Sequence, residues 1–155
     1  MGLLTALALI LFTVEAQIPA PVPIPGIKLG LSNIITVYAM FCLGPRDTIL
    51  ILLTRIFLGS VFSGQMMTLF YSFSGGMLCY AVMLLMRKLV TEQQIWVCSV
   101  LGAMAHNVGQ IIAAILIART PELIVYLPVL LISGIVTGAF TGICAQLIVR
   151  RLKHR

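Results

Sequence analysis

Residues 123–149 read LIVYLPVLLISGIVTGAFTGICAQLIV, a run of 27 residues that contains no Asp, Glu, Lys or Arg. About 20 such residues in a helix are long enough to cross the hydrocarbon core of a bilayer. The run ends in the basic sequence RRLKHR, residues 150–155, as is typical of a helix that reaches a membrane surface. This stretch predicts a membrane-spanning helix, and the rest of the chain must fold in the same environment.

The composition of the whole chain agrees with that environment. Of its 155 residues, 61% are hydrophobic and only 9% are charged, whereas a soluble domain carries about a quarter charged residues. Ten Lys and Arg and four Asp and Glu are too few to cover a water-exposed surface. The composition therefore excludes a soluble globular enzyme, a disordered chain and an ordinary nucleic-acid binder, despite a net charge of +6. The length predicts one membrane domain, residues 1–155.

Six apolar segments are separated by polar or helix-breaking residues. They cover residues 2–18, 27–43, 48–62, 66–86, 95–117 and 123–149. The first ends at the proline-rich sequence PAPVPIPG, residues 19–26, which cannot continue a helix. The pattern predicts an all-α, polytopic membrane protein with six transmembrane helices. The second and third segments are short for a full span, so we expect them to sit steeply or to be partly shielded by protein.

The basic residues are distributed unevenly between the two sides that this topology defines. Arg46, Arg87, Lys88 and the four basic residues of the tail fall on one side, and only Lys28 and Arg119 fall on the other. Because cytoplasmic loops carry the excess of Lys and Arg, we expect both termini in the cytoplasm. An alternative is that the first segment is a cleaved signal peptide, since VEA at residues 14–16 loosely resembles a cleavage site.

Several polar side chains interrupt the apolar segments, where an ionisable group costs roughly 2.5–3.5 kcal/mol. Placed on the predicted topology, most of them lie between the membrane midplane and the outer surface. Their convergence predicts a polar cavity that opens outward and binds a substrate. The alternative is structural, with Glu15 and Arg55 forming an ion pair and the amides joining helices by hydrogen bonds. The candidate binding residues are Glu15, Lys28, Asn33, Arg55, His106, Asn107 and Gln110.

The last segment also carries small residues at helical spacing. Gly134, Gly138 and Gly142 are four residues apart and therefore lie on one face of a helix. Small residues allow two helix backbones to approach closely, so this face is predicted to pack on another helix. The partner could be a helix of the same chain or a second subunit, and the pattern alone leaves both open.

The sequence lacks the patterns on which common catalytic sites depend. Asp47 is the only aspartate, so an Asp-rich, Mg²⁺-binding motif for a prenyl diphosphate cannot be built. The chain contains no P-loop sequence, and its four cysteines have no metal-ligand spacing. A lone His106 is more often a hydrogen-bonded core residue than a metal ligand. We therefore expect no catalytic activity, no metal and no cofactor.

Five strings bear a resemblance to one known family. They are PGIKLGLSNI (25–34), RIFLGSVFSG (55–64), SFSGGMLCY (72–80), GAMAHNVGQ (102–110) and YLPVLLISGIVTGAFTG (126–142). Together they resemble the bacterial Gx transporter family, also called heptaprenyl diphosphate synthase component I, over residues 18–152. That family is in turn similar to the S components of energy-coupling-factor transporters, which are six-helix membrane proteins that bind vitamins or related small molecules from outside.

The resemblance implies an S-component-like bundle in the bacterial cytoplasmic (inner) membrane. Its function would be to bind a small, anionic, vitamin- or cofactor-like molecule, with a separate transmembrane subunit and ATPases supplying energy. The family motif positions present here are Lys28, Asn33, Arg55, His106, Asn107 and Gln110. The family label leaves two alternatives. One is a membrane accessory subunit of heptaprenyl diphosphate or quinone metabolism, with a soluble synthase as partner. The other is a scaffold in a flavin-dependent electron-transfer complex.

Overall fold

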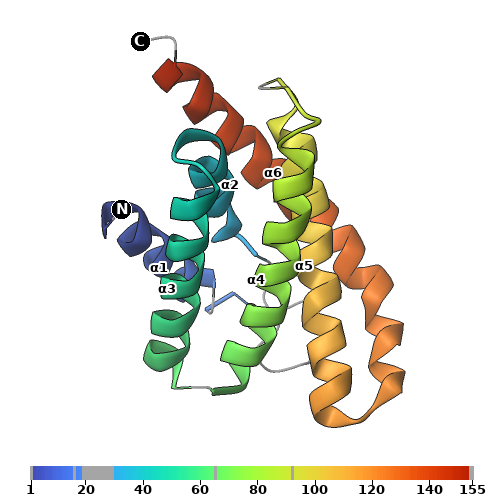
Figure 1. The fold of residues 1–155 in the computed structure, drawn as a ribbon. Helices are drawn as coiled ribbons and strands as arrows, with labels where there is room; N and C mark the ends of the chain where they lie inside the picture. The colour runs from blue at the N-terminus through green and yellow to red at the C-terminus, as the bar shows by residue number, and fades with distance from the viewer. Residues whose placement is uncertain (1, 16, 19–29, 65, 92, 154–155) are drawn as a thin grey trace.

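The computed structural model describes residues 2–15, 17–18, 30–64, 66–91 and 93–153. Within these ranges the chain forms six α-helices and one 3₁₀ helix, and no β-strand, which confirms the all-α prediction (Figure 1). In chain order the helices are α1 (Gly2–Glu15), α2 (Asn33–Cys42), α3 (Pro45–Ser63), α4 (Met66–Met86), α5 (Ile95–Ala118), the 3₁₀ helix η1 (Pro121–Tyr126) and α6 (Leu127–Lys153).

Among the described residues, three helical stretches are long and apolar enough to cross a membrane. They are α4 (Met66–Met86), α5 (Ile95–Ala118) and the continuous stretch Pro121–Leu152, which joins η1 to α6. The chain is therefore membrane-associated. Helix α3 has 19 residues but carries Arg46, Asp47 and Arg55, and α1 and α2 are shorter apolar helices. At 1.5 Å per residue, the ten residues of α2 rise about 15 Å, which is half the thickness of the hydrocarbon core.

The second predicted segment differs most from the structure. It was expected to be helical from residue 27, but the helix begins only at Asn33. Gly30 has a φ of +86°, a conformation that glycine adopts without strain and that a helix cannot contain. Residues 27–29 and the proline-rich sequence 19–26 lie outside the described residues. The result is a turn followed by a half-length helix where one continuous span was expected.

The other boundaries shift by a few residues for local reasons. Helix α1 ends at Glu15, before the expected residue 18. Helix α3 begins at Pro45, which fits the first turn because its missing N–H has no partner there. Residues 121–126, expected partly as α-helix, form the 3₁₀ helix η1, which leads directly into α6.

The bundle is built around α5. The most extensive helix pairings are α5 with α6 and α4 with α5, while α3 packs on α4 and α1 packs mainly on α3 (Figure 1). Helix α2 contacts α3, α5 and α6, and lies in the upper half of the view in Figure 1. Its Val37 and Met40 join Cys79, Met83 and Cys98 in the main apolar core. Helix α2 therefore packs along only one half of the length of the bundle.

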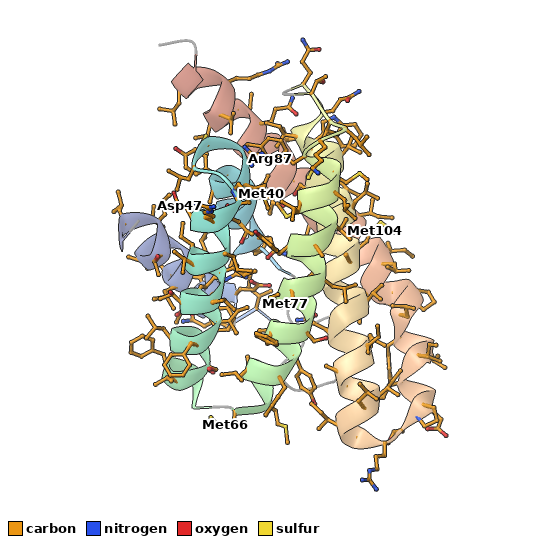
Figure 2. The ribbon with its side chains drawn as sticks, in the orientation of Figure 1. Met40, Asp47, Met66, Met77, Arg87 and Met104 are labelled. Carbon is orange, nitrogen blue, oxygen red and sulfur yellow. The ribbon has the colours of Figure 1, made fainter. Side chains whose placement is uncertain are left out.

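The connections lie at two opposite ends of the bundle. The α2–α3 turn, the α4–α5 loop and the end of α6 are at the top of Figure 1, and the α3–α4 and α5–α6 connections are at the bottom. Figure 2 shows Asp47 and Arg87 toward the top and Met66 at the bottom. The basic residues Arg46, Arg87, Lys88, Arg150 and Arg151 thus belong to the same end, as the charge pattern predicted.

The small-residue face of α6 lies against α5 of the same chain. A Cβ atom added to Gly138 would lie 2.8 Å from the Val100 Cα, and one added to Gly142 would lie 2.6 Å from the Trp96 Cα. Added at Gly134, it would lie 2.8 Å from the Asn107 Nδ2. These distances leave no room for a side chain, so the three glycines allow the close approach of the two helices.

Candidate functional site: a buried polar cluster

Five of the candidate binding residues lie in one buried region between the helices. We call it the buried polar cluster, and it comprises Glu15 of α1, Asn33 of α2, Arg55 of α3, and His106 and Gln110 of α5. Each of these side chains is at most 5% exposed. The cluster therefore takes residues from four helices that are distant in sequence.

Glu15 binds the beginning of α2. Its carboxylate accepts a hydrogen bond from the Gly30 N–H and a second, at 3.4 Å, from the Ser32 N–H. Both N–H groups belong to the turn that precedes α2, outside its first helical turn, so Glu15 fixes this turn and does not cap the helix. A carboxylate is also favoured at this position by the partial positive charge of the helix N-terminus. The geometry thus supports a structural role for Glu15, in holding α1 to α2.

The guanidinium of Arg55 is the positively charged group of the cluster. Arg55 is 2% exposed, and its Nη2 donates to the Asn33 Oδ1 at 3.5 Å. Among the described residues, its Nε and Nη1 have no hydrogen-bond partner. Glu15 attracts Arg55 electrostatically, but among the described residues the two make no ion pair within 4.0 Å, in contrast to the structural alternative considered from the sequence. A buried charge without full hydrogen bonding is costly, so these two atoms call for a partner.

His106 and Gln110 lie one turn apart on the same face of α5. A Cβ atom on Gly75 of α4 would lie 3.0 Å from both the His106 Cε1 and the Gln110 Cγ. On the other side of the ring, a Cβ on Gly30 would lie 3.0 Å from the Asn33 Nδ2 and 3.8 Å from the His106 Cδ2. The imidazole therefore lies between α4 and the turn that precedes α2. Within the part of the chain that the structure describes, no hydrogen-bond partner is found for the His106 Nδ1, for either polar atom of the Gln110 amide or for the Asn33 Nδ2.

Two glycines bring α4 and α5 close enough to form this region. A Cβ on Gly109 would lie 2.8 Å from the Gly75 Cα, and the Ser74 Oγ donates to the Gly109 carbonyl at 2.8 Å. Sequence reasoning did not assign Gly30, Ser74, Gly75 or Gly109 to the site. The sequence SGG within an otherwise apolar helix was the available signal, because serine and glycine there indicate close helix packing.

The remaining predicted site residues lie elsewhere. Asn107 contacts α6, where its Nδ2 donates to the Leu130 carbonyl, and its Oδ1 has no partner among the described residues. Arg119, which the charge pattern places on the outer side, is exposed at the end of α5 and lies outside the cluster. Lys28 lies outside the described residues.

The unpartnered atoms define what the cluster can bind. Four of them carry hydrogen-bond donors, namely the Arg55 Nε and Nη1, the Asn33 Nδ2 and the Gln110 Nε2. Only the Gln110 Oε1 and an unprotonated His106 Nδ1 can accept. An excess of donors around a guanidinium suits an anionic group, which accepts several hydrogen bonds at once. Among the described residues no three His, Cys, Asp or Glu side chains are grouped to hold a metal ion.

Comparison with known proteins gives one match. No curated protein and no solved structure shows significant similarity to the chain. Residues 4–148 match the family described as heptaprenyl diphosphate synthase component I. Because the match covers nearly the whole chain, including all five residues of the buried polar cluster, the protein belongs to the heptaprenyl diphosphate synthase component I family.

Proposed function

We propose that this chain is a non-catalytic membrane subunit that captures a small anionic molecule, in the manner of the S components of energy-coupling-factor transporters. The observation that carries the proposal is Arg55, a buried guanidinium with two unpartnered nitrogen atoms beside unpartnered amide groups. The energy for transport would come from a coupling transmembrane subunit and ATPases, because this chain has no P-loop.

Leaving the Arg55 Nε and Nη1 without hydrogen bonds costs free energy. Hydrogen bonds to charged groups contribute about 1.5–3 kcal/mol, and a buried group that lacks them loses that amount. An anion of small size would accept from the Arg55 Nε or Nη1 and from the neighbouring amides, and would recover this energy. A vitamin- or cofactor-like carboxylate or phosphate has the required chemistry.

The proposed membrane arrangement has six passes, with both termini in the cytoplasm of a bacterial cell. The basic end of the bundle faces the cytoplasm, as the bias of Lys and Arg favours. Helix α2 supplies only half of the second of these passes, and the turn before its N-terminus lies in the buried polar cluster. Half-helices that begin within the membrane are a common way to build ion and substrate sites in transporters.

A second candidate function follows from the family description. A component I of a heptaprenyl diphosphate synthase implies a partner, and this chain could be the membrane accessory subunit of that complex. With Asp47 as its only aspartate, it would depend on a soluble synthase for the Mg²⁺-binding residues. In that case the buried polar cluster would serve the fold of the subunit.

Native mass spectrometry of the chain, gently solubilised from its own membrane, tests the proposal. We expect a small anion bound to the wild-type protein and absent from the R55Q variant. The matched control is R119Q, which removes an exposed arginine outside the cluster and should retain the anion.

Two other results would contradict anion capture. A wild-type chain without a bound small molecule, but with a stoichiometric soluble partner, would favour the accessory-subunit function. An anion retained equally by R55Q would place binding elsewhere in the protein.

A further inference from the structure

We propose that capture of a monoanion at Arg55 is accompanied by uptake of one proton at His106, so that the buried polar cluster binds the anion and a proton together. This inference rests on the proposed function, because it concerns the same site. It adds how the site balances charge inside the membrane, and it predicts a measurable proton stoichiometry.

The first step is the charge of the unoccupied cluster. Glu15 accepts hydrogen bonds from two backbone N–H groups, and it and Arg55 are the two residues of the five that carry a formal charge. With His106 neutral, the formal charges of the cluster sum to zero. Helix α2, and α6 as far as Val149, contain no Asp, Glu, Lys or Arg that would change this sum.

The second step is the arrival of the ligand. A monoanion on the Arg55 Nε or Nη1 changes the sum to −1 in a region where every cluster side chain is at most 5% exposed. A net charge in a medium of low polarity is strongly unfavourable. A cation that forms nearby therefore stabilises the occupied site.

The third step identifies the group that can take the proton. His106 lies within electrostatic range of Arg55, and its Nδ1 has no hydrogen-bond partner. The charged groups nearest to it are Glu15 on α1 and Arg55 on α3. The surrounding helices also carry the titratable residues Tyr38 and Cys42 (α2), Arg46 and Asp47 (α3), Tyr71, Cys79 and Tyr80 (α4) and Cys98 (α5). Only a neutral imidazole among them gains positive charge by accepting a proton. Lys28 lies outside the described residues and does not enter this sum.

The balance of the step is simple. The anion and one proton leave the aqueous phase, the proton bonds to the Nδ1 of His106, and no bond in the ligand is broken. An anion on Arg55 also attracts both cations, which offsets the repulsion between Arg55 and a protonated His106. Because a proton is taken up on binding, the affinity for the anion falls as the pH rises, by up to tenfold for each pH unit.

Calorimetric titration of the full chain in detergent provides the test, with sodium formate, acetate and benzoate as probes. Each titration is repeated at one neutral pH in two buffers that differ in their enthalpy of ionisation, so that the difference in heat counts the protons taken up. We expect one proton for each anion bound by the wild-type protein. H106Q should bind the anion more weakly, with no proton uptake and no dependence of affinity on pH.

A second variant separates charge balance from a local effect at His106. E15Q retains a hydrogen-bond acceptor for the turn before α2 but leaves the empty cluster with a charge of +1. A monoanion then neutralises the cluster by itself, so E15Q should bind it without proton uptake even though His106 is present.

The outcomes distinguish this inference from the function on which it rests. Anion binding that requires Arg55 but takes up no proton in the wild-type protein overturns the inference and leaves anion capture standing. Proton uptake that persists in H106Q also overturns it. If none of the three probes binds and native mass spectrometry finds no Arg55-dependent anion, the proposed function itself fails.

Discussion

Helix α5 has some buried polar side chains that contact α6 and others that lie near α3 and α4, and the two groups differ in how completely their hydrogen bonds are satisfied. In the first group, the Ser99 Oγ lies 3.1 Å from the Thr141 Oγ1, and the Asn107 Nδ2 donates to the Leu130 carbonyl while its Oδ1 has no partner among the described residues. In the second group, the His106 Nδ1 and the whole Gln110 amide have no partner among the described residues. The first group joins α5 to α6, and the second leaves more of its polar atoms available to a ligand.

Glycines allow close packing beside both groups, so packing alone does not explain the difference. Gly138 and Gly142 meet the α5 backbone on one side, and Gly75 meets the His106 carbonyl at 2.7 Å from an added Cβ on the other. What differs is the cation. Only the α3 side presents an arginine, whose hydrogen-bonding capacity exceeds what its neighbours supply.

The largest effect is expected from R55Q, which should weaken binding of the captured anion by about 100-fold, equivalent to about 2.7 kcal/mol. The stability of the protein should not fall, because the substitution removes a buried charge that is only partly hydrogen-bonded. Binding by calorimetry and thermal unfolding in detergent measure the two quantities. A loss of stability without a loss of binding would indicate that Arg55 is structural.

The next largest effect is expected at the close contact between α5 and α6. G138L places a large side chain where a Cβ alone would lie 2.8 Å from the Val100 Cα, and should destabilise the protein by about 1–3 kcal/mol or more. The free energy of unfolding in mixed micelles measures this loss. The matched control is I135L, an exposed position on the same helix, where the change in stability should be negligible. Equal stability of the two variants would contradict the close α5–α6 contact.

A smaller effect is expected at the α4–α5 contact beside the buried polar cluster. S74A removes the hydrogen bond to the Gly109 carbonyl and should cost about 1 kcal/mol of unfolding free energy. The control S63A removes a hydrogen bond within the last turn of α3, to the Ser60 carbonyl, and should cost less. If S74A also weakens anion binding, the α4–α5 contact positions His106 and Gln110 as well as stabilising the fold.

The smallest expected effect is the coupling between Ser99 and Thr141. A double-mutant cycle with S99A and T141V should give about 0.6 kcal/mol, the average for hydrogen bonds between membrane helices. A coupling near zero would show that the two hydroxyls find other partners when separated. None of these variants should alter anion binding, because Ser99 lies seven residues, about 10 Å along α5, from His106.

Much of the candidate site could be anticipated from the sequence, since polar residues in apolar segments are conspicuous. Asn33, Arg55, His106 and Gln110 come together as their predicted depths in the membrane suggested, and only His106 and Gln110 are related by helical spacing. The sequence could not show that Asn107 contacts α6 while His106 lies near α4, because neighbouring residues on a helix can have different partners and only packing decides which. The role of Glu15 in fixing the turn before α2 depends on a contact between residues 15 and 30, which no local pattern indicates.

The sequence by itself determined the membrane environment, the positions of α4, α5 and α6, and the gathering of basic residues at one end of the bundle. These follow from hydropathy, helix-breaking residues and charge, which are local properties of the chain. Only the tertiary structure decided that α2 is a half-length helix, that the α6 glycines pack on α5, and that Arg55 keeps two nitrogen atoms unpartnered. Those features depend on which helices meet, and a hydrogen bond or close approach between distant residues is set by the packing of the whole bundle.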